Sequence, residues 1–142
     1  MTFKEVSPYV AERYPNLLSK NNTLIRVVEA KRTFWEKATI LHSIANKIGS
    51  PVPERYSRHY YDMFQLFNSE IKNEAFNDLD LLKSAKYHLA NSKTIELIPS
   101  LNKIQELQKD YREMNQMFFS DVVSFEEIIE GLRQMVEELR EL

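Results

Sequence analysis

The sequence predicts a mainly α protein: a helical bundle of about five or six helices with one short N-terminal strand. Two glycines and five prolines in 142 residues are few, which favours long helices and short turns, because strand-rich folds use glycine at their turns. Only one stretch has the composition of a strand. Hydrophobic content of 43% and charged content of 28% are typical of a globular chain, so we expect residues 1–142 to form a single helical domain.

The first elements are expected to be short. Ser7-Pro8 predicts an N-cap and first position for a helix that reaches about Arg13. Residues 23–30, TLIRVVEA, are rich in β-branched side chains and form the predicted strand. Because one strand cannot form a sheet, it must pack as irregular chain, pair with a copy of itself, or join a sheet outside residues 1–142.

Longer helices follow. Thr33 and Glu36 have the spacing of a capping box at the start of the first long helix, which Gly49 and Pro51 should end. Ser124 and Glu127 repeat that spacing before the last helix. The other helices are expected over residues 57–68, 72–91 and 99–119. Apolar residues recur in the last helix in steps of three and four, at Phe125, Ile128, Leu132, Met135, Leu139 and Leu142.

Composition excludes several classes of site. The net charge of −2 provides no field for nucleic acid, and there is no cysteine for a disulfide or thiolate metal site. The three histidines lack metal-ligand spacing, so we expect no metal site. Two glycines cannot build a glycine-rich phosphate loop. The sequence has no signal-peptide pattern and no membrane-length apolar run, which favours a cytoplasmic protein without a membrane partner.

One lysine interrupts an apolar face. On a helical wheel Lys37 falls between Leu41 and Ile44, inside the apolar sector of the first long helix. A buried ammonium is costly without a partner, so Lys37 either pairs with a carboxylate or faces a cleft. The alternative is that its stem covers apolar surface while the charge reaches water.

A second stretch supplies candidate partners for this lysine. Arg58 and Asp62 are four residues apart on one face of the next helix. One interpretation is an ordinary surface pair, worth about 0.3–0.5 kcal/mol. The other is that Lys37, Arg58 and Asp62 converge on one polar site, where the cations suit a phosphate and the carboxylate orients a reacting group.

These stretches resemble a known family. RTFWEKATILH (residues 32–42) followed by RYSRHYYDM (55–63) is similar to the nucleotidyltransferase AbiEii/AbiGii toxin family, with further matches in VSPYVAERYP, IRVVEA, DYREMNQMFF and FEEIIEGLRQM. The resemblance implies the C-terminal helical half of such an enzyme. It assigns Lys37, Arg58 and Asp62 to catalysis, and Lys37, Arg58 and Asp110 to nucleotide binding. Family members are toxins of toxin–antitoxin and abortive-infection systems, and some transfer nucleotides onto tRNA.

The sequence departs from the family in one respect. Members carry a Gly-Ser motif followed by an Asp-x-Asp pair, which holds the Mg²⁺ that activates a nucleoside triphosphate. Asp78-Leu79-Asp80 has the letters of that pair, but it lies after the lysine motif and no Gly-Ser motif leads into it. We therefore expect no catalysis from residues 1–142 alone. Mg²⁺, nucleoside triphosphate and an RNA acceptor are expected only with a complete enzyme.

Three hypotheses follow. In the first, the chain is the helical half of an AbiEii-like nucleotidyltransferase, either as one part of a split enzyme that works with a separate N-terminal half or as a remnant of such an enzyme, and an antitoxin is a further possible partner. In the second, it is a non-catalytic module derived from the family that binds a protein or forms a homodimer. The third, a helical ribonuclease of the HEPN type, requires four to six residues between its arginine and histidine. Arg55 and His59 have three between them, which disfavours it.

Overall fold

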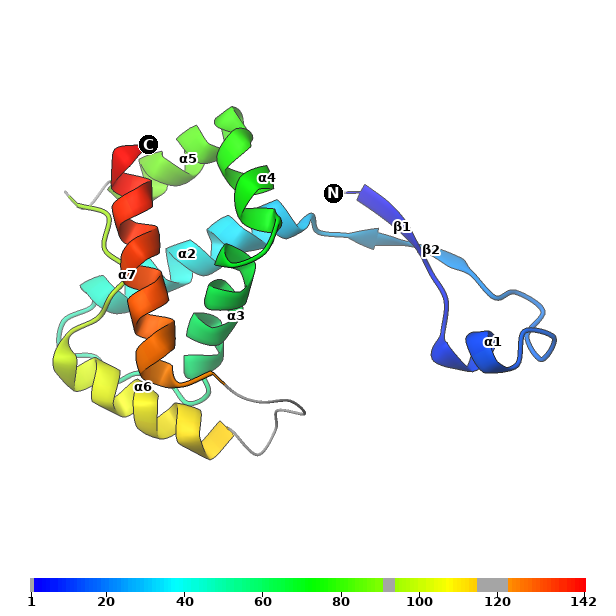
Figure 1. Ribbon diagram of the computed structural model, residues 1–142, viewed down its shortest axis with the longest axis horizontal. Coiled ribbons are helices and arrows are strands. Elements are labelled where there is room, and N and C mark those ends of the chain that lie inside the picture. The colour runs from blue at the N-terminus through cyan, green and yellow to red at the C-terminus, as the bar shows by residue number, and fades with distance from the viewer. Residues whose placement is uncertain (1, 91–93, 115–122) are drawn as a thin grey trace.

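A computed structural model describes residues 2–90, 94–114 and 123–142 of the chain and confirms the mainly α prediction (Figure 1). Seven helices and one two-stranded sheet lie within these residues. The strands are β1 (Thr2–Val6) and β2 (Thr23–Val27), and the helices are α1 (Tyr9–Arg13), α2 (Ala30–Asn46), α3 (Ser57–Phe67), α4 (Ile71–Asn77), α5 (Leu79–Ala90), α6 (Leu101–Met114) and α7 (Phe125–Glu141).

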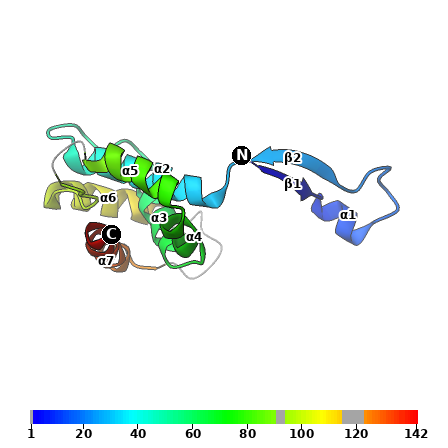
Figure 2. The ribbon, with the colours of Figure 1, turned by 90° about the horizontal axis from the view of Figure 1, so that it is seen from above.

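Helices α2 to α7 form a bundle around one apolar core. Helix α3 is central, because it packs against α2, α4, α6 and α7, and Figures 1 and 2 show these helices on different sides of it. The core residues include Phe34, Tyr60, Met63, Leu107 and Leu132, each fully buried. No helix of the described ranges is long and apolar enough to span a membrane.

The last helix, α7, begins where the sequence predicts, with Ser124 as its N-cap residue. The hydroxyl of Ser124 accepts a hydrogen bond from the backbone N–H of Glu127 at 3.2 Å, which satisfies one of the unpaired donors of the first turn. Five residues of the predicted stripe are buried, and Leu142 is exposed. This stripe therefore packs into the bundle core.

The first long helix begins three residues earlier than predicted. Glu29 is the N-cap residue of α2, so Thr33 and Glu36 lie inside the helix and form no capping box at its start. The helix ends at Asn46, and Gly49 adopts a positive φ of 75° just beyond it, a conformation that glycine adopts without strain.

The predicted third helix is two helices, α4 and α5. Asp78 lies between them and accepts a hydrogen bond from the backbone N–H of Leu81 at 3.1 Å, a capping contact that starts a new helix. The same carboxylate forms an ion pair with Lys31 of α2 at 2.9 Å. This break raises the helix number above the predicted five or six. The predicted end of the fourth helix, residues 115–119, lies outside the described residues.

The predicted N-terminal strand is present as β2, and it is one of two strands within the described residues. Residues 2–6 form β1, which pairs antiparallel with β2, with Thr2 opposite Val27 and Val6 opposite Thr23. The predicted lone strand therefore has a partner within the chain. We refer to residues 2–28 as the arm; it contains β1, α1 and β2. Figures 1 and 2 show the arm projecting away from the bundle beyond the start of α2.

Candidate functional site

Lys37 and Asp62 meet where α2 packs on α3. The ammonium Nζ of Lys37 donates a hydrogen bond to Oδ2 of Asp62 at 2.7 Å. The side chain of Lys37 is 16% exposed and that of Asp62 is 35% exposed. The charge of Lys37 is therefore largely shielded from water and paired with a carboxylate that solutes can reach. This agrees with the prediction of a carboxylate partner for Lys37.

His59 completes this contact and was missed from the sequence. Its Nδ1 lies 2.9 Å from Nζ of Lys37. A protonated ammonium can only donate, so Nδ1 acts as the acceptor and the ring proton belongs on Nε2. Burial, followed by the positive charge of Lys37, lowers the pKa of His59 below 6.5. The signal that sequence analysis overlooked is spacing, because His59 lies three residues before Asp62 on the same helix face.

Lys37, His59 and Asp62 form what we call the Lys37 cluster, and Arg58 lies next to this cluster but outside it. Its side chain is exposed, and no ion pair or hydrogen bond engages the guanidinium within the described ranges. Its charge is close enough to contribute to the lowered pKa of His59. The structure thus brings Lys37 and Asp62 together and leaves Arg58 available to a ligand, with five donors suited to a phosphate.

The carboxylate of Asp110 is occupied by hydrogen bonds from the residues at the start of α3. Its Oδ1 accepts from the N–H of Arg55 at 2.7 Å, and its Oδ2 accepts from the N–H and hydroxyl of Ser57 at 3.0 and 2.5 Å. These bonds attach α6 to the first turn of α3. The contacts give Asp110 a structural task, and its assignment to nucleotide binding stays a prediction.

A cavity lies beside the cluster. It has a volume of about 270 Å³ and is lined in part by Ile40, Ser43 and Tyr56. Ile40 is one helical turn beyond Lys37, and the ring of Tyr56 meets the ring of His59 edge to face with centroids 5.0 Å apart. Tyr56 therefore lies between the cavity and His59, and neither Lys37 nor Asp62 lines the cavity.

The described residues do not provide a metal site. No three side chains among His, Cys, Asp and Glu in these ranges are grouped so that they could hold an ion. Asp78, the first acid of the Asp-x-Asp-like pair, is engaged with Lys31 and Leu81. The described residues therefore do not fit Mg²⁺.

Comparison with known proteins identifies the family of the chain. A family model described as "Nucleotidyl transferase AbiEii toxin, Type IV TA system" matches residues 2–131, which includes the arm, α2 to α6 and the Lys37 cluster. No curated protein and no solved structure matched the chain. Since the family model covers most of its length, the chain belongs to the AbiEii nucleotidyl transferase toxin family of type IV toxin–antitoxin systems.

Proposed function

We propose that the chain is the helical part of an AbiEii-type nucleotidyltransferase toxin. In this proposal Lys37 and Arg58 bind the phosphates of a nucleoside triphosphate, and Asp62 orients Lys37. A separate core with the Gly-Ser and Asp-x-Asp motifs holds Mg²⁺, and the chain alone is inactive. The observation that carries the proposal is the contact between Lys37 and its two acceptors, Asp62 and His59.

The energetics support a functional reading of this contact. A largely buried ammonium loses hydration, and a well-packed apolar side chain in its place is often as stable or more so. Lys37 lies among apolar neighbours on α2, with Ala38 and Leu41 fully buried. A charge in such a position favours binding of an anion, because its interaction with phosphate is stronger where water is partly excluded.

The residues of the chain would act by binding and orientation. Asp62 and neutral His59 hold Nζ of Lys37 from two directions, which reduces the rotamer freedom that phosphate binding would otherwise have to remove. Arg58 adds a planar fork that can bind two phosphate oxygens. The cavity beside Tyr56 gives space for another part of the nucleotide. The acceptor in this proposal is RNA, bound by the complete enzyme.

The biological setting belongs to the same proposal. An antitoxin is the partner that a type IV toxin–antitoxin family calls for. We propose that the toxin acts in the cytoplasm as part of an abortive-infection response, where nucleotides and RNA acceptors are present. The nucleotide that it selects would be set by the complete cleft.

Reconstitution tests the proposal. The chain is mixed with a separately produced core from a family member that carries both motifs, and transfer of radiolabelled nucleotide to tRNA is measured with Mg²⁺. Lys37→Ala should lower transfer about 100-fold or more, the usual loss for one donor to a developing charge. Lys31→Ala is the matched control, because Lys31 lies on the same helix and also pairs with a carboxylate, that of Asp78. Equal activity of the two variants would contradict the role of Lys37.

The second candidate is a non-catalytic interaction module derived from the family. The observation that favours it is the exposed apolar surface of the arm, which is a feature of binding rather than of chemistry. In this case the Lys37 cluster would only join α2 to α3, and no core would restore transfer.

A further inference from the structure

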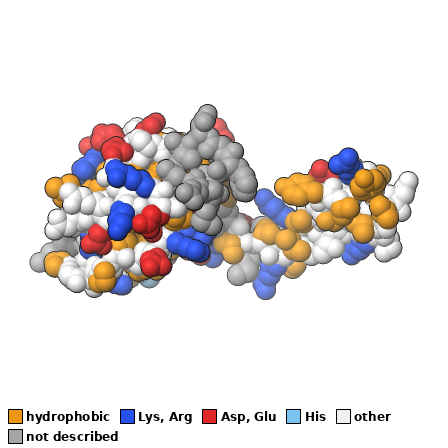
Figure 3. All heavy atoms as spheres, turned by 90° about the horizontal axis from the view of Figure 1, so that it is seen from below, with side chains coloured by type: hydrophobic (Ala, Val, Ile, Leu, Met, Phe, Trp, Pro, Cys, Tyr) orange, Lys and Arg blue, Asp and Glu red, His pale blue; other side chains and the backbone are white. Residues whose placement is uncertain are grey.

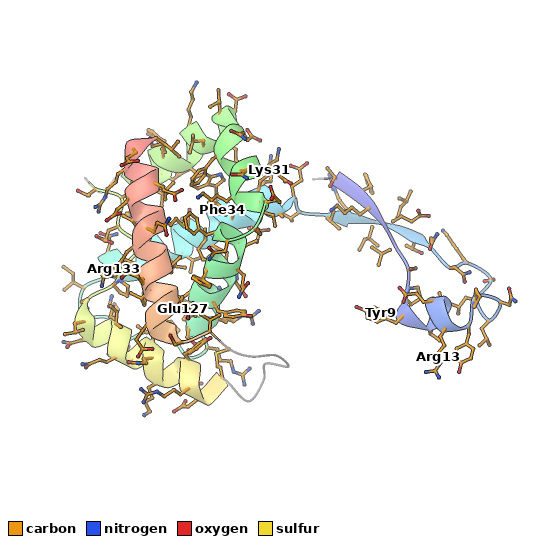
Figure 4. The ribbon with its side chains drawn as sticks, in the orientation of Figure 1. Tyr9, Arg13, Lys31, Phe34, Glu127 and Arg133 are labelled. Carbon is orange, nitrogen blue, oxygen red and sulfur yellow. The ribbon has the colours of Figure 1, made fainter. Side chains whose placement is uncertain are left out.

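The arm exposes an unusual amount of apolar surface. Ala11 is its only buried residue among positions 2–28, and Figure 3 shows hydrophobic side chains spread over it. Figure 4 places Tyr9 and Arg13 on α1 at the end far from the bundle, and Lys31 and Phe34 where α2 begins. The large apolar side chains exposed in the arm are Phe3, Val6, Tyr9, Val10, Tyr14, Leu17, Leu18, Leu24, Ile25 and Val28.

The strand register divides these side chains between two faces. Residues directly opposite one another share a face of a sheet. Phe3 lies opposite Arg26 and Leu24 opposite Glu5 on the first face. The second face carries Val6, Ile25 and Val27, opposite Thr23, Lys4 and Thr2. Both faces therefore carry apolar residues that the bundle does not cover.

The exposed area matches that of a stable interface. Phe3 is 68% exposed, Tyr9 89% and Leu24 67%. Together the ten apolar side chains leave on the order of 1,000 Å² open, taking roughly 150–200 Å² for each fully exposed residue. A standard protein–protein interface buries about 800 Å² per partner, so a partner that contacts both faces of the arm would bury an area of this size. This area indicates a partner that covers most of the arm.

A second copy of the chain does not fit this surface. Two hairpins paired edge to edge would satisfy the open backbone groups of β1 or β2 but leave both faces exposed. Two hairpins stacked face to face would cover one face only. Sheets with apolar residues on both faces occur where helices cover both sides, as in α/β domains. The surface instead fits an α/β domain whose sheet has an open edge.

We propose that the arm is the docking element of the chain and adds its two strands to the open sheet edge of an α/β partner domain. Main-chain hydrogen bonds at the edge would supply affinity, and the side chains on both faces would enter the partner's two layers. An isolated two-stranded hairpin is marginally stable, so docking would also fix its structure. This inference rests on the proposed function, because the partner it names is the nucleotidyltransferase core.

Photo-crosslinking tests the proposal in the native host. The full chain is produced with p-benzoylphenylalanine in place of Phe3 on the first face, Ile25 on the second face, or Tyr87, a 69% exposed control on α5. Adducts are identified by mass spectrometry. We expect Phe3 and Ile25 to give the same α/β partner carrying the Gly-Ser and Asp-x-Asp motifs, and Tyr87 to give none. Adducts only with a second copy, from one face only, or from neither face would overturn the inference.

Crosslinking from a fourth position, Arg58, distinguishes failure of this inference from failure of the proposed function. A partner with both motifs that is crosslinked from Arg58, but from neither arm position, would support the proposed function and overturn the docking role of the arm. An α/β partner that is crosslinked from Phe3 and Ile25 but lacks the motifs would support docking and contradict the proposed function.

A charge substitution gives an independent measurement on the folded chain. Leu24→Lys should lower recovery of the partner at least tenfold, while Leu101→Lys should leave recovery unchanged. The two leucines match closely, being 67% and 70% exposed, and Leu101 lies on α6 outside the arm. Both variants should keep the helical circular dichroism of the parent. Equal recovery with both variants would overturn the inference.

Discussion

The contacts of Asp110 predict a large loss of stability when its carboxylate is removed. Both oxygens accept hydrogen bonds, from the N–H groups of Arg55 and Ser57 and from the hydroxyl of Ser57, at 2.5 to 3.0 Å. A hydrogen bond to a charged group contributes about 1.5–3 kcal/mol, and these bonds share one acceptor group, so they do not add fully. Asp110→Ala should therefore cost about 2–4 kcal/mol, because the start of α3 loses its cap and its attachment to α6.

Urea unfolding followed by circular dichroism measures this loss. Glu113→Ala is the control, since Glu113 is an exposed carboxylate on the same helix, and substitution at such a site usually changes stability by less than about 0.5 kcal/mol. Asp110→Asn should recover part of the loss, because an amide oxygen still accepts while its NH₂ group cannot. A free energy of unfolding for Asp110→Ala within about 0.5 kcal/mol of the Glu113→Ala value would refute this reasoning.

Two further outcomes are expected. His59 has a lowered pKa, so as pH falls below 6.5 the unfolded chain gains a proton there that the folded chain does not, and the free energy of unfolding decreases. His59→Gln should make this dependence shallower in urea titrations from pH 7 to pH 5; an unchanged slope would contradict it. Gly131→Ala would place a Cβ 2.5 Å from the ring of Phe64, which should cost about 1–3 kcal/mol, offset by up to about 1 kcal/mol of helix propensity. Thermal unfolding beside Glu130→Ala checks this, and a rise in Tm would contradict it.

Features set by local side-chain chemistry could be predicted from the sequence. Ser124 and Glu127 marked the start of α7, and steps of three and four residues marked its buried face. The charge of Lys37 within an apolar stripe predicted either a carboxylate partner or a cleft, with a charge that reaches water as the alternative, and Asp62 lies 2.7 Å from it. In each case the deciding residues lie on one helix or on two helices in direct contact.

Features that depend on contacts distant in sequence could not be predicted. β1, with the sequence TFKEV, is short and has two adjacent charged residues at its centre instead of a strand-like alternation, and it becomes a strand only because β2 lies beside it. Thr33 had the right spacing for a cap, yet the preceding residues continue the helix back to Ala30. Asp110 contacts the start of α3 although it lies more than fifty residues away in sequence. No local sequence pattern predicts such a contact.

The short connection between the arm and the bundle has a mechanical consequence. Strand β2 ends at Val27 and α2 begins at Ala30, so only two residues separate them and they allow little independent rotation. Lys37 follows Ala30 by two helical turns, about 10 Å along the axis. A change in the position of the arm therefore also moves the start of α2. A partner that binds the arm would in this way help to set the orientation of Lys37 toward its ligand.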